Sequence, residues 1–546
     1  MATTAVSLLK NTLVEDLNGI PEQGSLQQRH RSVFLITALS AYAFLVHGYH
    51  PFSEDGGLYL AGIKRVLAPG MYPHEAGFVL GHLRFSLFAP ALAFAVRVSG
   101  LNLEVVLLLV HWMSIWITLW AAWMLAERCF QGKARVAAVA LLATWLTLPV
   151  AGTSLMLMDP YVTARSISTP CTLLALVFAL DLFQRWQREY VLDRWTVAKL
   201  GIVFALAATM HPLMAAYGFG CVLALGVATT RWRRSWIAGA AALCAAAVIV
   251  AAILRLAAQP ESSDYRQVAM SRYYWFLSRW QWYEWLGLLG PMAILTFTAF
   301  PRKNRDTEAA TILARMSLTV ATAAVLVALL FAWPNATNLL VARLQPLRIF
   351  QIVYVVMILI VGAQLSVWLG NRRTRWAATF LVLASIMFLA ERETFPSSAH
   401  IEMPDSQQKN AWVQAFEWIR NNTPKDALFA LDADYITKPG EDAQSFRAIA
   451  ERSALPDYSK DGGEAAITPS LTAAWRAGQT LQSKLSDRSD HDRIASLQPA
   501  GVSWVVLARG AVTALPCRYT NAAVKVCPLP AGAMQTGSLG LLQAKR

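Results

Sequence analysis

The sequence predicts an α-helical polytopic membrane protein that carries a small α/β domain outside the membrane. The chain of 546 residues is 56% hydrophobic and only 15% charged, which leaves too little charged surface for a soluble protein of this length. Apolar runs of about 17–24 residues recur along it and have the length of helices that cross a bilayer. Short Arg-rich links separate these runs. They contribute to the net charge of +14 and are typical of cytoplasmic loops, so nucleic acid is not an expected partner.

The predicted spans are about eleven apolar segments. Basic clusters in the links mark the cytoplasmic side, and the number of crossings between two such clusters must be even. The sequence therefore divides into a cytoplasmic N-terminal segment (1–32), a transmembrane module (33–394) and an extracytoplasmic α/β domain (395–546). The spans cover residues 33–49, 103–126, 136–152, 167–184, 199–212, 213–230, 236–257, 283–300, 311–333, 347–370 and 375–391.

Residues 84–100 are the difficult case in this count. They are apolar enough to resemble a span in part, but they carry Arg84 and Arg97. Counting them as a crossing would also place Arg128 outside the cytoplasm. We interpret them as an interfacial or re-entrant helix within the first outer loop, which covers about residues 50–102.

Residues 199–230 form one long apolar run that the even count divides into two short helices. The predicted turn lies at His211 and Pro212, because proline lacks an amide hydrogen and clashes with a preceding carbonyl.

The composition becomes polar after residue 391. Residues 411–422 ("AWVQAFEWIRNN") have the pattern of an amphipathic helix that ends at Thr423 and Pro424. The stretches "ALFALD" and "VSWVVLAR" are interpreted as short buried strands. These elements predict a small α/β domain outside the membrane.

Two of the six cysteines lie in this terminal domain. Cys517 and Cys527 flank "RYTNAAVKV", and a hairpin with Asn521 near its turn would bring them together. An oxidising compartment allows a disulfide between them, and two unpaired thiols are the alternative.

The first outer loop begins with an acidic pair, Glu54 and Asp55, where the chain first leaves the membrane. The structural interpretation is that Asp55 caps a short amphipathic helix on the membrane surface. The functional one is that Asp55, with Glu54 beside it, is a catalytic base for an acceptor hydroxyl held at the bilayer surface.

This layout resembles the GT-C superfamily of polytopic glycosyltransferases. "SEDGGLYLAGI" is similar to the acid-then-Tyr opening of that family, and "FEWIRNNTPKDALFALDAD" looks like the start of the outer domain in its bacterial members. The resemblance implies a sugar donor linked to a polyprenyl phosphate. It also implies a glycan, lipid or protein acceptor outside the cytoplasm.

A second acidic motif, frequent in that family, is represented here only by Asp159 in "MDPYVTARS". This departure leaves a divalent cation, Mg²⁺ or Mn²⁺, undecided, and no cofactor is assigned. Asp159, Tyr161 and Arg165 are expected to face the same compartment as Asp55. An Asp159–Arg165 pair that only caps a span is the alternative to a substrate-binding role in which Arg165 holds a phosphate.

Further substrate-binding candidates lie at the outer ends of other spans. Arg343 and Arg348 precede the tenth span, and an arginine there either binds phosphate oxygens or extends towards lipid headgroups. His211 is either a turn residue or part of the site, and His74 in the first outer loop is a weaker candidate of the same kind.

With this resemblance, the sequence as a whole favours a membrane glycosyltransferase of the cell envelope, in a bacterial inner membrane. A transporter or flippase of lipid-linked glycans is one alternative, although transporters place charged groups near mid-bilayer and are built from repeats, which this sequence lacks. A non-catalytic membrane scaffold whose terminal domain binds a partner is the other alternative.

Overall fold

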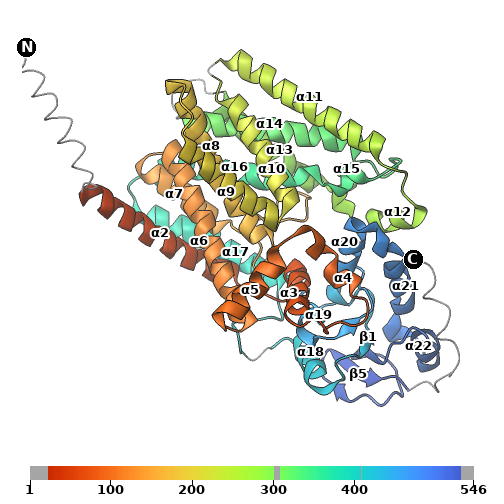
Figure 1. The fold of residues 1–546 in the computed structure, drawn as a ribbon. Helices are drawn as coiled ribbons and strands as arrows, with labels where there is room; N and C mark the ends of the chain where they lie inside the picture. Colours follow the sequence, from red (N-terminus) through yellow and green to blue (C-terminus); the bar gives the residue numbers. More distant parts are fainter. Residues whose placement is uncertain (1–22, 231, 301–307, 407–408, 531–546) are drawn as a thin grey trace, which may run out of the picture.

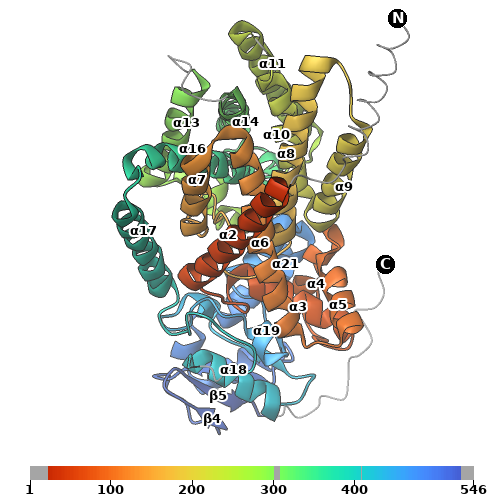
Figure 2. The ribbon, with the colours of Figure 1, turned by 90° about the vertical axis from the view of Figure 1, so that its left-hand side faces the viewer.

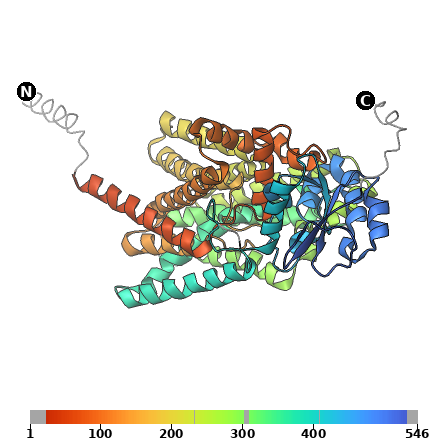
Figure 3. The ribbon, with the colours of Figure 1, turned by 90° about the horizontal axis from the view of Figure 1, so that it is seen from below.

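The computed structural model describes residues 23–230, 232–300, 308–406 and 409–530. A bundle of long helices carries the sheet domain at one end (Figure 1, Figure 3). Each predicted span overlaps one helix of the bundle. These helices are α2 (Gln23–His47), α6 (Leu103–Cys129), α7 (Gly132–Thr144), α8 (Arg165–Glu189), α9 (Arg194–Met210), α10 (Pro212–Ala228), α11 (Arg233–Ala257), α13 (Trp282–Ala299), α14 (Glu308–Phe331), α16 (Phe350–Leu369) and α17 (Arg373–Thr394).

The number of crossings is supported only in part. Six of the described helices are long and apolar enough to cross a membrane, or seven if one bent pair counts as a span. They are α6, α8, α11, α14, α17 and the stretch Leu340–Leu369, which joins the short helix α15 (Leu340–Arg343) to α16. Helix α7 has 13 residues and α9 and α10 have 17 each, fewer than the roughly 20 that a straight span needs. The full count of about eleven therefore stays a prediction.

The break inside the long apolar run 199–230 is confirmed. Helix α9 ends at Met210 and α10 begins at Pro212, with His211 between them in a non-helical conformation at φ −148° and ψ 88°. Proline in the first turn of α10 has no amide hydrogen that would need a partner there.

The first outer loop is largely helical. It contains α3 (Glu54–Leu67), α4 (Gly77–Leu80), the 3₁₀ turn η1 (His82–Phe85) and α5 (Phe88–Ser99). The segments Gly77–Phe85 and Phe88–Ser99 meet at 95°, as in a broken span or a re-entrant loop. This bend agrees with the predicted re-entrant segment, and α5 packs against α3 and α6.

The terminal domain contains a five-stranded sheet in the order β2-β1-β3-β5-β4. Strand β1 is parallel to β2 and β3, whereas β5 is antiparallel to β3 and β4. The predicted amphipathic helix is α18, with the predicted bounds Ala411–Asn422, and the two predicted strands contain β1 and β3. The other elements are α19 (Phe446–Ala450), α20 (Lys460–Ile467), α21 (Thr472–Gln482) and α22 (Asp490–Leu497), with strands β1 (Leu428–Ala430), β2 (Ser453–Ala454), β3 (Trp504–Ala508), β4 (Tyr519–Thr520) and β5 (Val524–Pro528).

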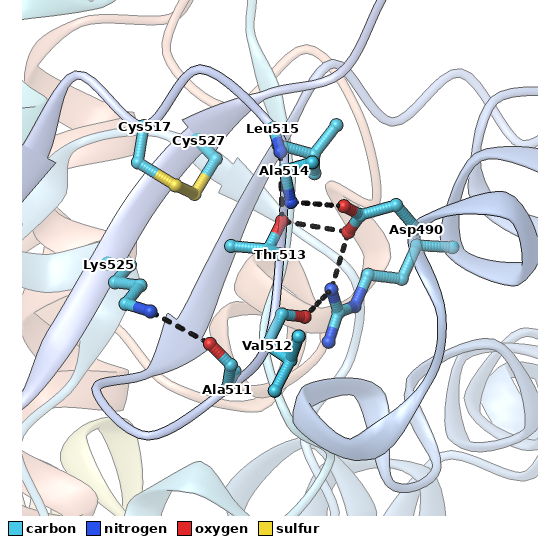
Figure 4. Close-up of a disulfide and its surroundings, with 10 residues drawn as sticks. Asp490, Ala511, Val512, Thr513, Ala514, Leu515, Cys517, Lys525 and Cys527 are labelled. Carbon is cyan, nitrogen blue, oxygen red and sulfur yellow. Dashed lines mark hydrogen bonds and ion pairs between the residues drawn. A yellow bond between two sulfur atoms is a disulfide. The ribbon is translucent and has the colours of Figure 1, made fainter.

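Strands β4 and β5 form a hairpin that the Asn521 side chain stabilises. Its carboxamide oxygen accepts hydrogen bonds from the backbone N–H groups of Ala523 and Val524 at 2.9 and 3.0 Å. Cys517 and Cys527 are joined by a disulfide beside this hairpin (Figure 4). The bond ties the last strand of the sheet to the loop before β4.

The terminal domain packs on the first outer loop. Helix α3 contacts α19 and α20, and α20 also contacts α4 and the short helix α12 (Ser263–Met270). Figure 2 shows α3 and α5 beside α19, below the bundle. The junction between bundle and sheet domain is therefore built from α3, α19 and α20.

Candidate functional site

A cluster of five charged side chains occupies this junction. The Arg165 guanidinium, at the first residue of α8, donates to Asp55 Oδ2 at 3.0 Å and to Asp159 Oδ2 at 2.9 Å. Lys460, at the first residue of α20, forms an ion pair with Glu54 and lies 3.3 Å from Asp55 Oδ1. The structure thus brings together Asp55, Asp159 and Arg165, as expected, and adds a lysine from the terminal domain.

Burial divides this cluster into a closed half and an open half. The side chains of Arg165 and Asp159 are 7% and 6% exposed, whereas those of Asp55 and Glu54 are 32% and 40% exposed. A guanidinium so buried is stable only beside its two carboxylates. Asp55 is therefore the carboxylate of the Arg165 group that an incoming molecule can reach.

The local backbone presents the acidic pair. Helix α3 begins at Glu54 and its N-cap is Ser53, whose side chain makes no capping bond. The interpretation of Asp55 as the capping residue is therefore wrong, because its carboxylate is bound to Arg165. Glu54 has a φ of +53°, an unusual value for a residue other than glycine. Its N–H donates to the Ala443 carbonyl at 2.8 Å, which holds this conformation.

Neighbouring charges set the protonation of the carboxylates. Burial raises the pKa of Asp55, but the charges of Lys460 and Arg165 outweigh it and hold that pKa well below the ordinary value. Burial raises the pKa of Asp159 more than the Arg165 charge lowers it. The acidic pair raises the pKa of the Lys460 ammonium despite burial. Asp55 is consequently ionised, and it is a weak base as long as Lys460 contacts it.

Arg348 supplies a further positive charge. It lies in the 3₁₀ turn η4 (Pro346–Ile349), lines a small pocket with Thr153 and Tyr274, and its charge contributes to the lowered pKa of Asp55. Its Nε has no hydrogen-bond partner and its guanidinium no carboxylate within ion-pair distance in the part of the chain that the structure describes. A guanidinium of this kind is suited to bind an anion.

The remaining substrate-binding candidates of the sequence differ in whether they contact the elements of this cluster. Tyr161 is buried with its Cβ facing Gly56 of α3. His211 caps α10 by accepting from the Met214 N–H at 3.4 Å, so it is at least a turn residue. Arg343 lies over the Tyr265 ring at 5.8 Å, and His74 donates to the Asp426 carbonyl at 3.1 Å, so neither contacts the cluster.

Sequence reasoning missed Lys460. The sequence offers one signal, since "EDGG" at 54–57 and "KDGG" at 460–463 each begin a helix with charged residues followed by two glycines. Only the fold shows that the two helix starts face each other.

The cluster does not have the donor set of a divalent-cation site. Magnesium and manganese prefer several free carboxylate oxygens, but Asp55 and Asp159 are already paired with Arg165 and Lys460. Among residues 23–230, 232–300, 308–406 and 409–530, no group of three or more His, Cys, Asp or Glu side chains could hold a metal ion. The Mg²⁺ or Mn²⁺ left undecided by the sequence stays undecided, and in this structure the Asp55 and Asp159 carboxylates are shared with Arg165 and Lys460.

Comparison with known proteins leaves the family open. No known protein-family profile matches the chain, and no curated protein matches its sequence. Among solved structures, it is similar to an oligosaccharyltransferase from Archaeoglobus fulgidus tethered with an acceptor peptide, at 12% identity and a TM-score of 0.48, over 89% of this chain and 70% of that one. It is also similar to the AglB protein of that archaeon in complex with an inhibitory peptide and a dolichol-phosphate, at 12% identity and a TM-score of 0.45, over 88% and 70%. Likeness at this level decides neither fold family nor activity.

Proposed function

We propose that the protein is a membrane glycosyltransferase that moves a sugar from a polyprenyl-phosphate carrier to an acceptor outside the cytoplasm. The observation that carries this proposal is the cluster of Asp55, Arg165 and Asp159 together with Arg348, whose charge acts on Asp55 and whose guanidinium has no carboxylate partner among the described residues. The proposal thus rests on an accessible carboxylate and a nearby cation where membrane helices meet an outer domain.

The reaction in this proposal is a single displacement. The acceptor hydroxyl oxygen attacks the anomeric carbon, the bond from that carbon to the phosphate oxygen breaks, and the hydroxyl proton passes to Asp55. The phosphate leaves on the polyprenyl carrier, and the anomeric centre is inverted. A carboxylate within hydrogen-bond reach of the hydroxyl is the group that this step needs.

Arg348 is the proposed partner of the leaving phosphate. The phosphate gains negative charge as the bond breaks, and a positioned guanidinium stabilises that charge most where water is excluded. Arg165 is less suited to this role because both of its carboxylate partners are already in place.

Lys460 has to move for Asp55 to act as a base. Its ammonium lowers the proton affinity of the Asp55 carboxylate, which lies 3.3 Å away. An acceptor that displaces the lysine would raise this proton affinity at the moment of binding. The side chain is 19% exposed and belongs to the terminal domain, so an incoming molecule can reach it.

The test is turnover of the carrier. Membranes that contain the protein are incubated with a panel of polyprenyl-phosphate pentoses and hexoses, and release of the polyprenyl phosphate is measured. We expect release with at least one donor and a loss of roughly 10²–10³-fold in Arg348→Gln. Arg97→Gln, which changes an exposed arginine of the first outer loop, is the matched control and should keep the parent rate.

Two results would contradict the proposal. The first is the absence of carrier release with every donor of the panel. The second is a parent-like rate in Arg348→Gln. Movement of an intact donor across the bilayer without release would instead favour the transporter alternative.

A further inference from the structure

A second pair of buried polar groups lies beside the charged cluster. Glu464 follows Lys460 by four residues on α20, so both side chains point from the same face of that helix. The Glu464 Oε2 atom lies 3.9 Å from Nδ1 of His82 in η1 of the first outer loop. The Glu464 side chain is 3% exposed and the His82 side chain 11% exposed.

Glycines make room for both polar ends. A Cβ atom on Gly81 would lie 2.0 Å from Oε1 of Glu464, and a Cβ atom on Gly62 would lie 2.9 Å from Nε2 of His82. Both distances are too short for a real contact, so only glycine at these positions allows the carboxylate and the imidazole to approach as they do.

The pair is incompletely hydrogen-bonded. Neither ring nitrogen of His82 has a hydrogen-bond partner within the described ranges, and Glu464 accepts a long bond of 3.4 Å from the Thr468 hydroxyl. Burial raises the pKa of Glu464 to about 7. Buried polar atoms of this kind usually have a partner, and a neutral imidazole offers one donor and one acceptor.

The distance between the two side chains fits one bridging group. At 3.9 Å, Glu464 and His82 are too far apart for a direct hydrogen bond. A single oxygen can nevertheless lie about 2.8 Å from both atoms. A hydroxyl group suits this position, because its oxygen accepts from the imidazole N–H while its proton is donated to the carboxylate.

We infer that Glu464 and His82 form a subsite that holds a hydroxyl group of a sugar acceptor. This inference rests on the proposed function and extends it, since it assigns the acceptor to the polyhydroxylated class and places it beside Asp55. Lys460 contacts Asp55 one helical turn from Glu464. An acceptor held by Glu464 and His82 therefore reaches the lysine that has to move.

The inference is tested by binding rather than turnover. The full-length protein in detergent is mixed with methyl glycosides of glucose, galactose, mannose and arabinose, and binding is measured by saturation-transfer NMR without any donor. We expect at least one glycoside to bind the parent. Glu464→Gln and His82→Ala should each weaken that binding about tenfold to a hundredfold, because a hydroxyl group loses its partner.

The control variant loosens the same interface without changing the pair. Glu451 forms an ion pair with Lys64 of α3 at 2.7 Å, and Glu451→Gln should leave glycoside affinity within about twofold of the parent. The same glycosides with every hydroxyl methylated should not bind. The inference is overturned if the parent binds no glycoside, if Glu464→Gln binds as the parent does, or if the methylated glycosides bind equally well.

Failure of the two proposals can be told apart. A parent that binds glycosides but releases no carrier phosphate disproves the proposed function and leaves the sugar subsite standing. A parent that releases carrier phosphate at a rate unaffected by Glu464→Gln, and binds no glycoside, overturns the subsite alone.

Discussion

Asp55 is bound by two cations that come from distant parts of the chain. Arg165 belongs to the helical bundle and is nearly buried, whereas Lys460 belongs to the terminal domain and is partly exposed. Substitution of Asp55 therefore has a structural and a chemical consequence, and the two can be measured separately.

Asp55→Asn should reduce sugar transfer far more than it reduces stability. Asparagine keeps the size of the side chain and can still accept from Arg165, so the free energy of unfolding should fall by roughly 1–3 kcal/mol. It is a poor base, so carrier turnover should fall roughly 10²–10⁴-fold. Both quantities are measured on membranes that contain equal amounts of folded protein.

Glu54→Gln is the companion variant. Glu54 is more exposed than Asp55 and, among the described residues, forms its ion pair with Lys460 alone, so its loss should reduce turnover less than the loss of Asp55. If Glu54→Gln alone abolishes transfer, the base is Glu54. Parent-like transfer by Asp55→Asn would exclude Asp55 from proton transfer.

His50 holds the loop that carries the acidic pair. Its ring Nε2 lies 2.6 Å from Glu391 and its ring Nδ1 lies 2.8 Å from Glu402, and the side chain is fully buried. The backbone N–H of His50 donates to the Pro160 carbonyl. Burial alone lowers the pKa of His50, but the hydrogen bonds and charges of the two glutamates raise it above the ordinary histidine value.

The raised pKa of His50 predicts pH-dependent stability. The unfolded chain has an ordinary histidine pKa of about 6.5. Because the pKa of His50 is higher in the folded protein, protonated His50 stabilises the fold fully below about pH 6.5. This stabilisation is lost as the pH rises through the folded pKa. The melting temperature, followed by tryptophan fluorescence, should therefore fall as pH increases above about 6.5. His50→Gln should reduce this slope, to which the raised pKa of Glu464 also contributes, and cost roughly 3–5 kcal/mol, because Glu391 and Glu402 each lose a buried partner.

His491→Gln is the control for this measurement. The His491 side chain is 91% exposed, so its substitution should leave both the slope and the melting temperature unchanged. A parent that melts at the same temperature across this range would contradict the charged state assigned to His50.

At this scale the sequence predicts four of the five charged residues of the cluster and misses Lys460. Asp159 and Arg165 stand out because charged residues next to apolar runs need partners. Lys460 and Asp55 are separated by 405 residues, and no local pattern in a polar domain distinguishes one lysine from another. The pairs of His50 and of Glu464 were missed for the same reason.

Among the elements, α3 is fixed in place by its glycines. A Cβ atom on Gly57 would lie 2.2 Å from Cβ of Ser445 in the terminal domain and 2.5 Å from the Phe52 carbonyl. The backbone of α3 therefore contacts the terminal domain directly, and any larger side chain must separate the two.

Gly57→Ala should loosen this contact. Overpacking of such an interface typically costs about 1–3 kcal/mol, and the terminal domain, pushed away at Ser445 before α19, should carry Lys460 of α20 away from the site. We expect a lower melting temperature and faster proteolysis between the bundle and the terminal domain. Gly70→Ala is the matched control, since a Cβ atom there meets nothing within 4 Å. Equal melting temperatures for the two variants would disprove this account of the junction.

A helix is well predicted from the sequence where its apolar stripe and its end signal lie in the same short segment. The bounds of α18 agree with the prediction, because an apolar stripe and a following Thr-Pro are both local. Local patterns predict the membrane crossings less well. Helices α7, α9 and α10 are shorter than a full span, and their positions depend on packing against neighbouring helices.

For the whole molecule, the orientation of the chain decides whether the site faces the donor. The basic clusters predict that the α8–α9 connection is cytoplasmic and that the terminal domain is outside. Cysteines introduced by Glu189→Cys and Lys438→Cys test this in intact cells with a membrane-impermeant maleimide. We expect labelling at position 438 and, only after the membrane is opened, at position 189.

The parent protein sets the background for this labelling, since Cys129, Cys171 and Cys221 are buried but Cys244 of α11 is only half-buried. Labelling of both introduced cysteines on the same side would show that the count of crossings is wrong. If both are labelled only after the membrane is opened, the cluster around Asp55, which includes Lys460 of the same domain, faces the compartment opposite to the predicted one.

The separation of Asp55 and Lys460 also sets an order in time. A ribosome that adds roughly 5–20 residues per second needs about 20–80 s for the 405 residues between them. For most of this interval the growing chain has Asp55, Asp159 and Arg165 but not yet Lys460. A chain that stops before residue 460 can insert its spans and still lacks one wall of the site. The cluster of five charged side chains is therefore complete only after the terminal domain has been made, and truncated copies lack both Lys460 and Glu464.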